Sequence, residues 1–238
     1  MNTFVDALGF LRDNPALIWE KVVQHLQLAG AAIGVALVIA IPIGVILGHQ
    51  HRGSFLAINA ANIGRALPSL ALISIGLGFL GVGFVNVMVA MVILAVPPLM
   101  TNAYVAVDQV DADAVEAARG MGMRPVQVLT KVELPLALPL IFAGIRTAVV
   151  YVIATGTLAA IAGGGGLGDI IFNQPSYHLS GVIAGSMVIA TLAFTAEGIF
   201  AVLQRALTPR GIRGREPEVD AFIEPPVADV TRAETARV

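Results

Sequence analysis

The chain contains no cysteine, few charged residues and few aromatic residues. Among its 238 residues, Asp, Glu, Lys and Arg together make up 13% and aromatic residues 6%. The missing cysteines exclude disulfides, cysteine-based metal sites and thiol nucleophiles. A net charge of −2 argues against a nucleic-acid partner. Soluble domains carry roughly twice this share of charge, so the chain has too little to cover a water-facing surface.

What the chain does contain is long apolar runs. Hydrophobic residues make up 57% of it, and the mean hydropathy is +0.84. A membrane-spanning helix needs about 20 apolar residues. We therefore predict an all-α polytopic membrane protein with about five spanning helices. The stretches without Asp, Glu, Lys or Arg are 22–51, 66–107, 147–168 and 170–196. The predicted spans are roughly 26–47, 60–80, 84–107, 136–161 and 181–205.

The two ends of the chain differ from the predicted membrane domain at 26–207. Residues 1–25 are apolar on one helical face, and Trp19 lies next to charged residues, as at a membrane edge. We predict an extracytoplasmic, interfacial segment there, with a mobile tail as the alternative. Residues 208–238 are rich in Pro, Arg and Glu, which predicts a disordered cytoplasmic tail.

Basic residues predict the orientation of the spans, because they gather on the cytoplasmic side. With this assignment the amino terminus lies outside and the carboxyl terminus lies in the cytoplasm. The connections on the opposite side carry only Arg12 and Lys21. The basic residues assigned to the cytoplasmic side are Arg52, Arg119, Arg124, Lys131, Arg210, Arg213 and Arg215.

The longest connection, residues 108–135, predicts two short helices. Asp113 and Glu116 fit a capping box with Asp113 at the N-cap, and Gly122 permits a sharp turn. Pro125 suits the first turn of the second helix, which the Leu-Pro pair at 134–135 is expected to end. We interpret this loop as a docking element, with a solvated linker as the alternative.

The same loop resembles the EAA motif of ATP-binding cassette (ABC) importer permeases. That pattern is Glu-Ala-Ala, three residues, Gly, nine residues, an aliphatic residue, one residue, then Leu-Pro. The one departure is Val where Ile is usual. The matching residues are Glu116, Ala117, Ala118, Gly122, Val132, Leu134 and Pro135.

The resemblance extends over about residues 19–207, through stretches such as VPPLMTNAY and AAIAGGGGLGDIIF. These are similar to permeases of the glycine betaine, carnitine and choline subfamily of osmoprotectant importers. This resemblance implies that the chain is the transmembrane domain of a type I ABC importer in the cell inner membrane. The implied partners are a pair of ATPase subunits, a second permease (identical or a sibling), an extracytoplasmic substrate-binding protein and membrane lipid.

In that family the EAA loop is a coupling helix that fits a cleft on the separate ATPase subunit. The resemblance therefore implies contact for the EAA residues, with Arg119 as a polar neighbour. It also implies that ATP is bound by the partner, that this chain is no enzyme and that it holds no cofactor. An Ala118→Arg substitution is expected to uncouple transport while the protein still inserts.

The cargo implied by the resemblance is a small osmoprotectant such as glycine betaine, carnitine, choline or a proline-like solute. An aromatic cage normally holds quaternary amines, and the low aromatic content favours placing that cage on the binding protein. The alternatives are a permease for another small solute, such as an amino acid or a metal, and an ATP-independent secondary transporter. We find no internal repeat and no acids in mid-span to support the last of these.

Three ionisable residues lie in or near spans, where an unpaired charge is costly. Arg65, Arg146 and Glu197 either line a substrate path or form a structural pair near the inner membrane face. We hypothesise that Glu197 pairs with Arg146 or with Arg65.

Other motifs are interpreted more simply. GGGGLGD at 163–169 lacks the Lys-Ser or Lys-Thr of a phosphate loop, and we expect a flexible turn near the binding-protein contact. We expect the histidines to be solvated loop residues, and no metal site is predicted. They are His25, His49, His51 and His178. The glycine pairs spaced four apart indicate helix contacts or ordinary abundance. They are Gly30/Gly34, Gly44/Gly48 and Gly181/Gly185.

Overall fold

Every regular element is a helix in the part of the chain that the structure describes. The computed structural model describes residues 3–52, 55, 59, 62 and 66–207. The elements are α1 Thr3–Asp13, α2 Pro15–His49, α4 Ser69–Leu80, α5 Phe84–Asp108, α6 Ala112–Gly120, α7 Pro125–Val128, the π-helical turn η1 Leu129–Glu133, α8 Leu134–Thr155, the 3₁₀ segment η2 Gly156–Ala162, α9 Gly168–Ile171 and α10 Gln174–Leu207.

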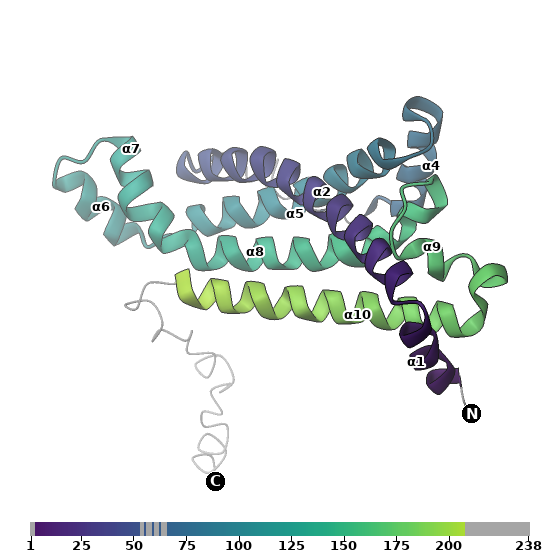
Figure 1. Ribbon diagram of the computed structural model, residues 1–238. Coiled ribbons are helices and arrows are strands. Elements are labelled where there is room, and N and C mark those ends of the chain that lie inside the picture. The colour runs from purple at the N-terminus through teal and green to yellow at the C-terminus, as the bar shows by residue number, and fades with distance from the viewer. Residues whose placement is uncertain (1–2, 53–54, 56–58, 60–61, 63–65, 208–238) are drawn as a thin grey trace, which may run out of the picture.

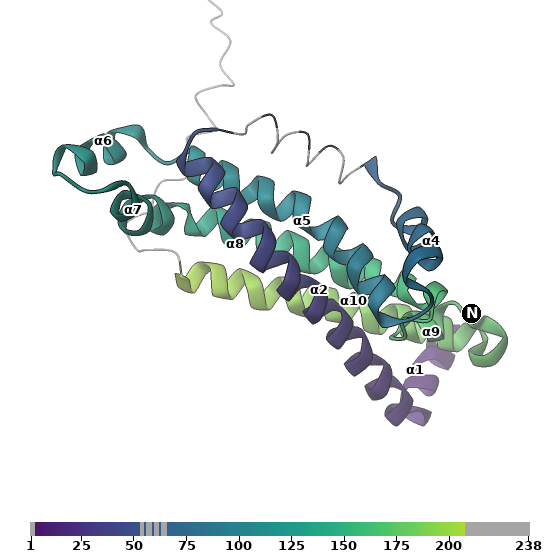
Figure 2. The same ribbon diagram turned by 90° about the horizontal axis from the view of Figure 1, so that it is seen from above.

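Four long helices, α2, α5, α8 and α10, run side by side and form the body of the molecule (Figure 1). Within it α5 packs against both α2 and α8, and α10 packs on α8. Both views place α6 and α7 at one end of this bundle, and α1, α4 and α9 toward the other (Figures 1 and 2). We call these the α6 end and the α9 end.

The core between α2 and α5 depends on small side chains. Ala32, Ala36 and Ala40 are spaced four apart, so they share one face of α2, and all three are fully buried. They pack in one apolar cluster with larger residues of α5, among them Val87 and Met91. In a membrane, where lipid is as apolar as the core, such close backbone approach is a main source of helix association.

Two of the three glycine pairs lie at helix contacts. A Cβ on Gly44 would meet the carbonyl oxygen of Met100 at 2.5 Å, and one on Gly48 would meet that of Tyr104 at 2.7 Å. Near the α9 end, Gly181 and Gly185 lie against side chains instead: a Cβ on Gly181 would meet the Phe10 ring at 3.2 Å, and one on Gly185 would meet the Ile171 side chain at 3.1 Å. Gly30 and Gly34 are different, since a Cβ there would meet no described atom within 4 Å.

The predicted second span, 60–80, is described only in part, because residues 60, 61 and 63–65 lie outside the described residues. Its described part contains α4, with 12 residues, and helical residues at Asn62 and Ala66. At about 1.5 Å per residue α4 is about 18 Å long, which is short of a hydrocarbon core of about 30 Å. The described residues therefore hold four helices of membrane-spanning length and one short apolar helix.

The first span begins earlier than predicted. α2 starts at Pro15, in the first helical position, and continues for 35 residues. α1 precedes it and packs on α10, where the rings of Phe10 and Tyr177 meet edge to face with centroids 6.1 Å apart. α10 is itself broken near its start, since His178 has a φ of 55°.

We expect Gly44→Val to lower the melting temperature of the purified chain in detergent by several degrees. The added side chain would collide with the backbone of α5, and overpacking of this kind costs about 1–3 kcal/mol. Gly78→Val is the matched control, because a Cβ at Gly78 meets no described atom within 4 Å. Equal melting temperatures for the two variants would contradict the close contact between α2 and α5.

Candidate functional site

The polar loop at 108–135 folds into a compact segment at the α6 end. α6 begins after Asp111, whose carboxylate accepts a hydrogen bond from the Asp113 backbone N–H at 3.0 Å. The prediction of Asp113 as the N-cap is therefore wrong by two residues, since Asp111 reaches the free amide first. The predicted turn lies at Gly122, whose φ of 83° suits glycine.

The segment has a small apolar core of its own. Val115 and Ala118 of α6 are buried against Val128 of α7, and Met123 and Val132 pack around them. Ala118 therefore points into the segment rather than outward. Consequently an Ala118→Arg substitution would disrupt this core, and it cannot by itself report on docking.

The outer face of α6 carries Glu116 and Ala117 of the EAA motif and the neighbouring Arg119. Glu116, Ala117 and Arg119 are exposed. In the same loop, Met121 is 73% exposed and Val126 is 70% exposed. The sequence interpretation did not single out these two residues, although large apolar side chains in a polar loop are a usable signal of a contact surface.

The segment continues into α8 without a break. Leu129–Glu133 form a π-helical turn, and the Leu134 N–H donates back to the Leu129 carbonyl. The prediction that Leu134 and Pro135 end the helix is wrong. Proline has no N–H to donate, but Pro135 lies in the first turn of α8, where this loss is tolerated. Leu134 packs with the apolar cluster shared by α2, α5 and α8.

Two histidines at the end of α2 bind acids. His49 donates from Nδ1 to Glu133 Oε2 at 2.6 Å, and the Glu133 side chain is only 2% exposed. His51 donates to Asp108 Oδ1 at 2.9 Å, and both of these side chains are more exposed. For His49 the expectation of a solvated loop histidine is wrong.

The remaining histidines behave in opposite ways. His25 is buried, with Nε2 at 2.9 Å from the Ile153 carbonyl, so the expectation of a solvated residue is wrong for it too. His178 is exposed, as expected. Within the described residues no group of three or more His, Cys, Asp or Glu could hold a metal ion.

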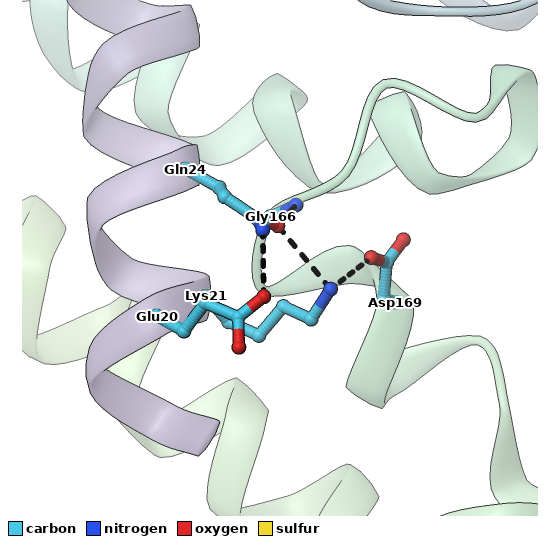
Figure 3. A network of polar contacts seen from close by, with 5 residues as sticks. All are labelled: Glu20, Lys21, Gln24, Gly166 and Asp169. Carbon is cyan, nitrogen blue, oxygen red and sulfur yellow. Dashed lines mark hydrogen bonds and ion pairs between the residues drawn. The ribbon is translucent and has the colours of Figure 1, made fainter. Parts of the chain in front are cut away.

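The glycine-rich loop at the α9 end is tied to α2 by a polar network (Figure 3). Lys21 Nζ lies 2.7 Å from Asp169 Oδ2, and it donates to Gln24 Oε1 at 3.2 Å. The Gly166 N–H donates to the same Gln24 oxygen at 3.2 Å, and Gln24 Nε2 donates to Glu20. The sequence interpretation as a flexible turn omitted these partners.

An open hollow of about 370 Å³ adjoins this network. Its lining combines an ion pair with two aromatic rings. The lining residues are Lys21, Ala160, Asp169, Phe172, Asn173 and Tyr177.

The structure brings together two of the three ionisable residues predicted in or near spans. Arg146 Nε lies 3.1 Å from Glu197 Oε1, which joins α8 to α10. Gln204 reinforces this link by donating to the Pro139 carbonyl at 2.9 Å. Arg65 lies outside the described residues.

The sequence matches a family model described as "Binding-protein-dependent transport system inner membrane component" over residues 40–213. The match covers well over half of the chain. The chain therefore belongs to this family of membrane permeases.

Curated relatives narrow the comparison. The chain is 37% identical to the glycine betaine/carnitine/choline transport system permease protein OpuCB of Bacillus subtilis, over 87% of this chain and 96% of that protein. It is 37% identical to the choline transport system permease protein OpuBB of the same organism, over 86% and 94%. It is 34% identical to the osmoprotectant import permease protein OsmW of Salmonella typhimurium, over 88% and 100%.

Solved structures share the fold. An inward-facing MetNI methionine ABC transporter chain matches with a TM-score of 0.72 at 22% identity, covering 82% of this chain and 99% of that chain. A chain of an amino acid ABC transporter matches with a TM-score of 0.67 at 16% identity, covering 84% and 97%. The fold is thus that of a type I ABC importer transmembrane domain.

We expect the Lys21–Asp169 pair to stabilise the α9 end by at most about 1 kcal/mol, because both side chains are partly exposed. Lys21→Asp places two carboxylates side by side and should lower the melting temperature. Adding Asp169→Lys restores an ion pair with reversed charges and should recover part of the loss. A double variant no more stable than Lys21→Asp alone would show that the pair contributes nothing.

Proposed function

We propose that this chain is the permease subunit of an ATP-driven importer for a small osmoprotectant of the quaternary-amine class. The main support is the 37% identity to OpuCB over 87% of the chain. Identity to the methionine transporter chain is 22%, so similarity favours an osmoprotectant over an amino acid as cargo. A stand-alone secondary transporter would need its own coupling ions, and the family match favours a partner-driven permease instead.

The α6 end is the docking site for a separate ATPase in this proposal. Its outer face combines the charges of Glu116 and Arg119 with the small Ala117 and the apolar Met121. A small residue between charged neighbours lets a helix approach a cleft closely, and the exposed apolar side chains supply contact area. Each of a pair of ATPase subunits would receive one such segment.

Docking of the ATPase at the α6 end also implies an orientation of the bundle in the membrane. The basic residues Arg119, Arg124 and Lys131 lie in the α6–η1 region, which this proposal places in the cytoplasm. The α9 end then faces outward, where a substrate-binding protein would deliver cargo. The glycine-rich loop at 163–169 and the adjoining hollow lie at that end.

A second permease copy, identical or a sibling, would complete the translocation path. Large apolar side chains on several helices are exposed in the single chain, among them Val38 at 75% and Phe194 at 78%. In the assembly such faces contact lipid or the neighbouring permease. ATP-driven closure of the ATPase pair would move the coupling segments and shift the spans between inward-open and outward-open states. The selective aromatic cage would reside on the binding protein.

Reconstitution in liposomes tests this function directly. The chain with its ATPase and binding protein is expected to take up radiolabelled glycine betaine only when ATP is present. Omission of either partner should reduce uptake to background. Uptake by the chain alone, at the rate of the full assembly, would overturn the proposal.

We expect Ala117→Arg to reduce ATP-dependent uptake at least tenfold while membrane insertion is unchanged. The exposed arginine would hold α6 away from the ATPase cleft without entering the segment's own core. Ala117→Ser is the matched control, because it places a polar side chain at the same exposed position without the length needed to hold α6 away from the cleft. Normal uptake and normal ATPase stimulation by Ala117→Arg would exclude this face as the docking surface.

A further inference from the structure

Glu133 is a buried acid where η1 meets α8. We call η1 the π-helical joint, and α6 with α7 the coupling segment. Glu133 is 1% exposed, and it receives one hydrogen bond, from His49. Its second carboxyl oxygen, Oε1, is buried without a hydrogen-bond partner among the described residues. Burying a carboxyl group is costly unless it is hydrogen-bonded, so the position of Glu133 depends on His49.

The Glu133–His49 pair lies where two helical elements meet. Glu133 is the last residue of η1, through which α7 passes into α8. A π-helical turn is a local departure from the α-helical hydrogen-bond pattern, and such turns occur frequently at functional sites. η1 is thus the backbone connection between α7 and α8.

His49 comes from a different helix, 84 residues earlier in the chain. It is the last residue of α2, which packs along α5 through Gly44 and Gly48. The His49–Glu133 bond therefore joins η1 directly to the end of α2. A movement of the joint acts on α8 through the backbone and on α2 through this side-chain bond.

We propose that His49 and Glu133 are positioning residues of the transport cycle, which hold the π-helical joint against α2 so that the coupling segment moves α2 and α8 together. This inference rests on the proposed function. His49 and Glu133 touch neither substrate nor nucleotide in this account. Their role is to transmit the displacement of the docked segment to a second spanning helix.

The neighbouring histidine–acid pair provides an internal comparison. His51 and Asp108 also join the end of α2 to another helix, but their side chains are 55% and 31% exposed. Water can replace that hydrogen bond at little cost, whereas loss of the His49 donor leaves a buried carboxyl group unpaired. The two pairs should therefore respond differently to the same substitution.

The test uses the complete reconstituted assembly and measures substrate molecules transported per ATP hydrolysed. We expect His49→Ala to lower this ratio at least fivefold while ATP hydrolysis stays within twofold of the unmodified assembly. His49→Asn keeps a donor near the position of Nδ1 and should recover most of the ratio. His51→Ala is the matched control and should leave the ratio unchanged. An unaltered ratio in His49→Ala would overturn the proposal.

A second variant separates transmission from simple stability. The double variant His49→Leu with Glu133→Leu removes both polar partners and so leaves no buried polar group unpaired. Its melting temperature should be higher than that of His49→Ala and close to that of the unmodified chain. A persistently low transport ratio in this stable double variant supports a positioning role, and a normal ratio overturns it. Absence of ATP-dependent uptake in the unmodified assembly would instead refute the proposed function, so the two failures are distinguishable.

Discussion

The close contact of α2 with α5 is the constraint on which the rest of the structure depends. A stripe of Ala and Gly residues along one face of α2 brings the two backbones together, and no larger residue fits at Gly44 or Gly48. This contact fixes the end of α2 beside the end of α5. As a result His49 reaches η1 and His51 reaches Asp108. Polar links at this end thus follow from apolar packing along the helices.

Different interactions hold the two ends of the bundle together. At the α6 end, a compact segment has its own core and presents a mixed charged and apolar outer face. At the α9 end, a backbone loop with several glycines at positive φ is tied to α2 by side-chain hydrogen bonds and one ion pair. This difference between the α6 end and the α9 end agrees with the proposed function, in which the α6 end contacts a partner protein and the α9 end receives a solute.

The sequence was sufficient for features that depend on composition and short spacing. The charge-free runs predicted the four long helices of the described residues, and the motif around Glu116 located the polar segment. One contact between distant residues, the Arg146–Glu197 pair, followed from the cost of an unpaired charge in a span, but the other distant contacts were not predicted. Lys21 and Asp169 are 148 residues apart, and the burial of His25 follows from the packing of α2 beside α8. The π-helical turn was missed because its hydrogen-bond register has no signature in spacing alone. The N-cap was placed at Asp113 because its spacing to Glu116 fits a capping box, whereas the side chain of Asp111 makes the capping hydrogen bond.

The contact of α1 with α10 has a consequence for the order of assembly during synthesis. The first described helix packs against the last described long helix, through Phe10 and Tyr177. The ribosome completes α10 only after α2, α5 and α8 have emerged, so the face of α1 that packs on α10 stays uncovered until then. The contact between α1 and α10 can therefore form only once α10 has been made, and a chain cut short before α10 would leave Phe10 without its neighbour.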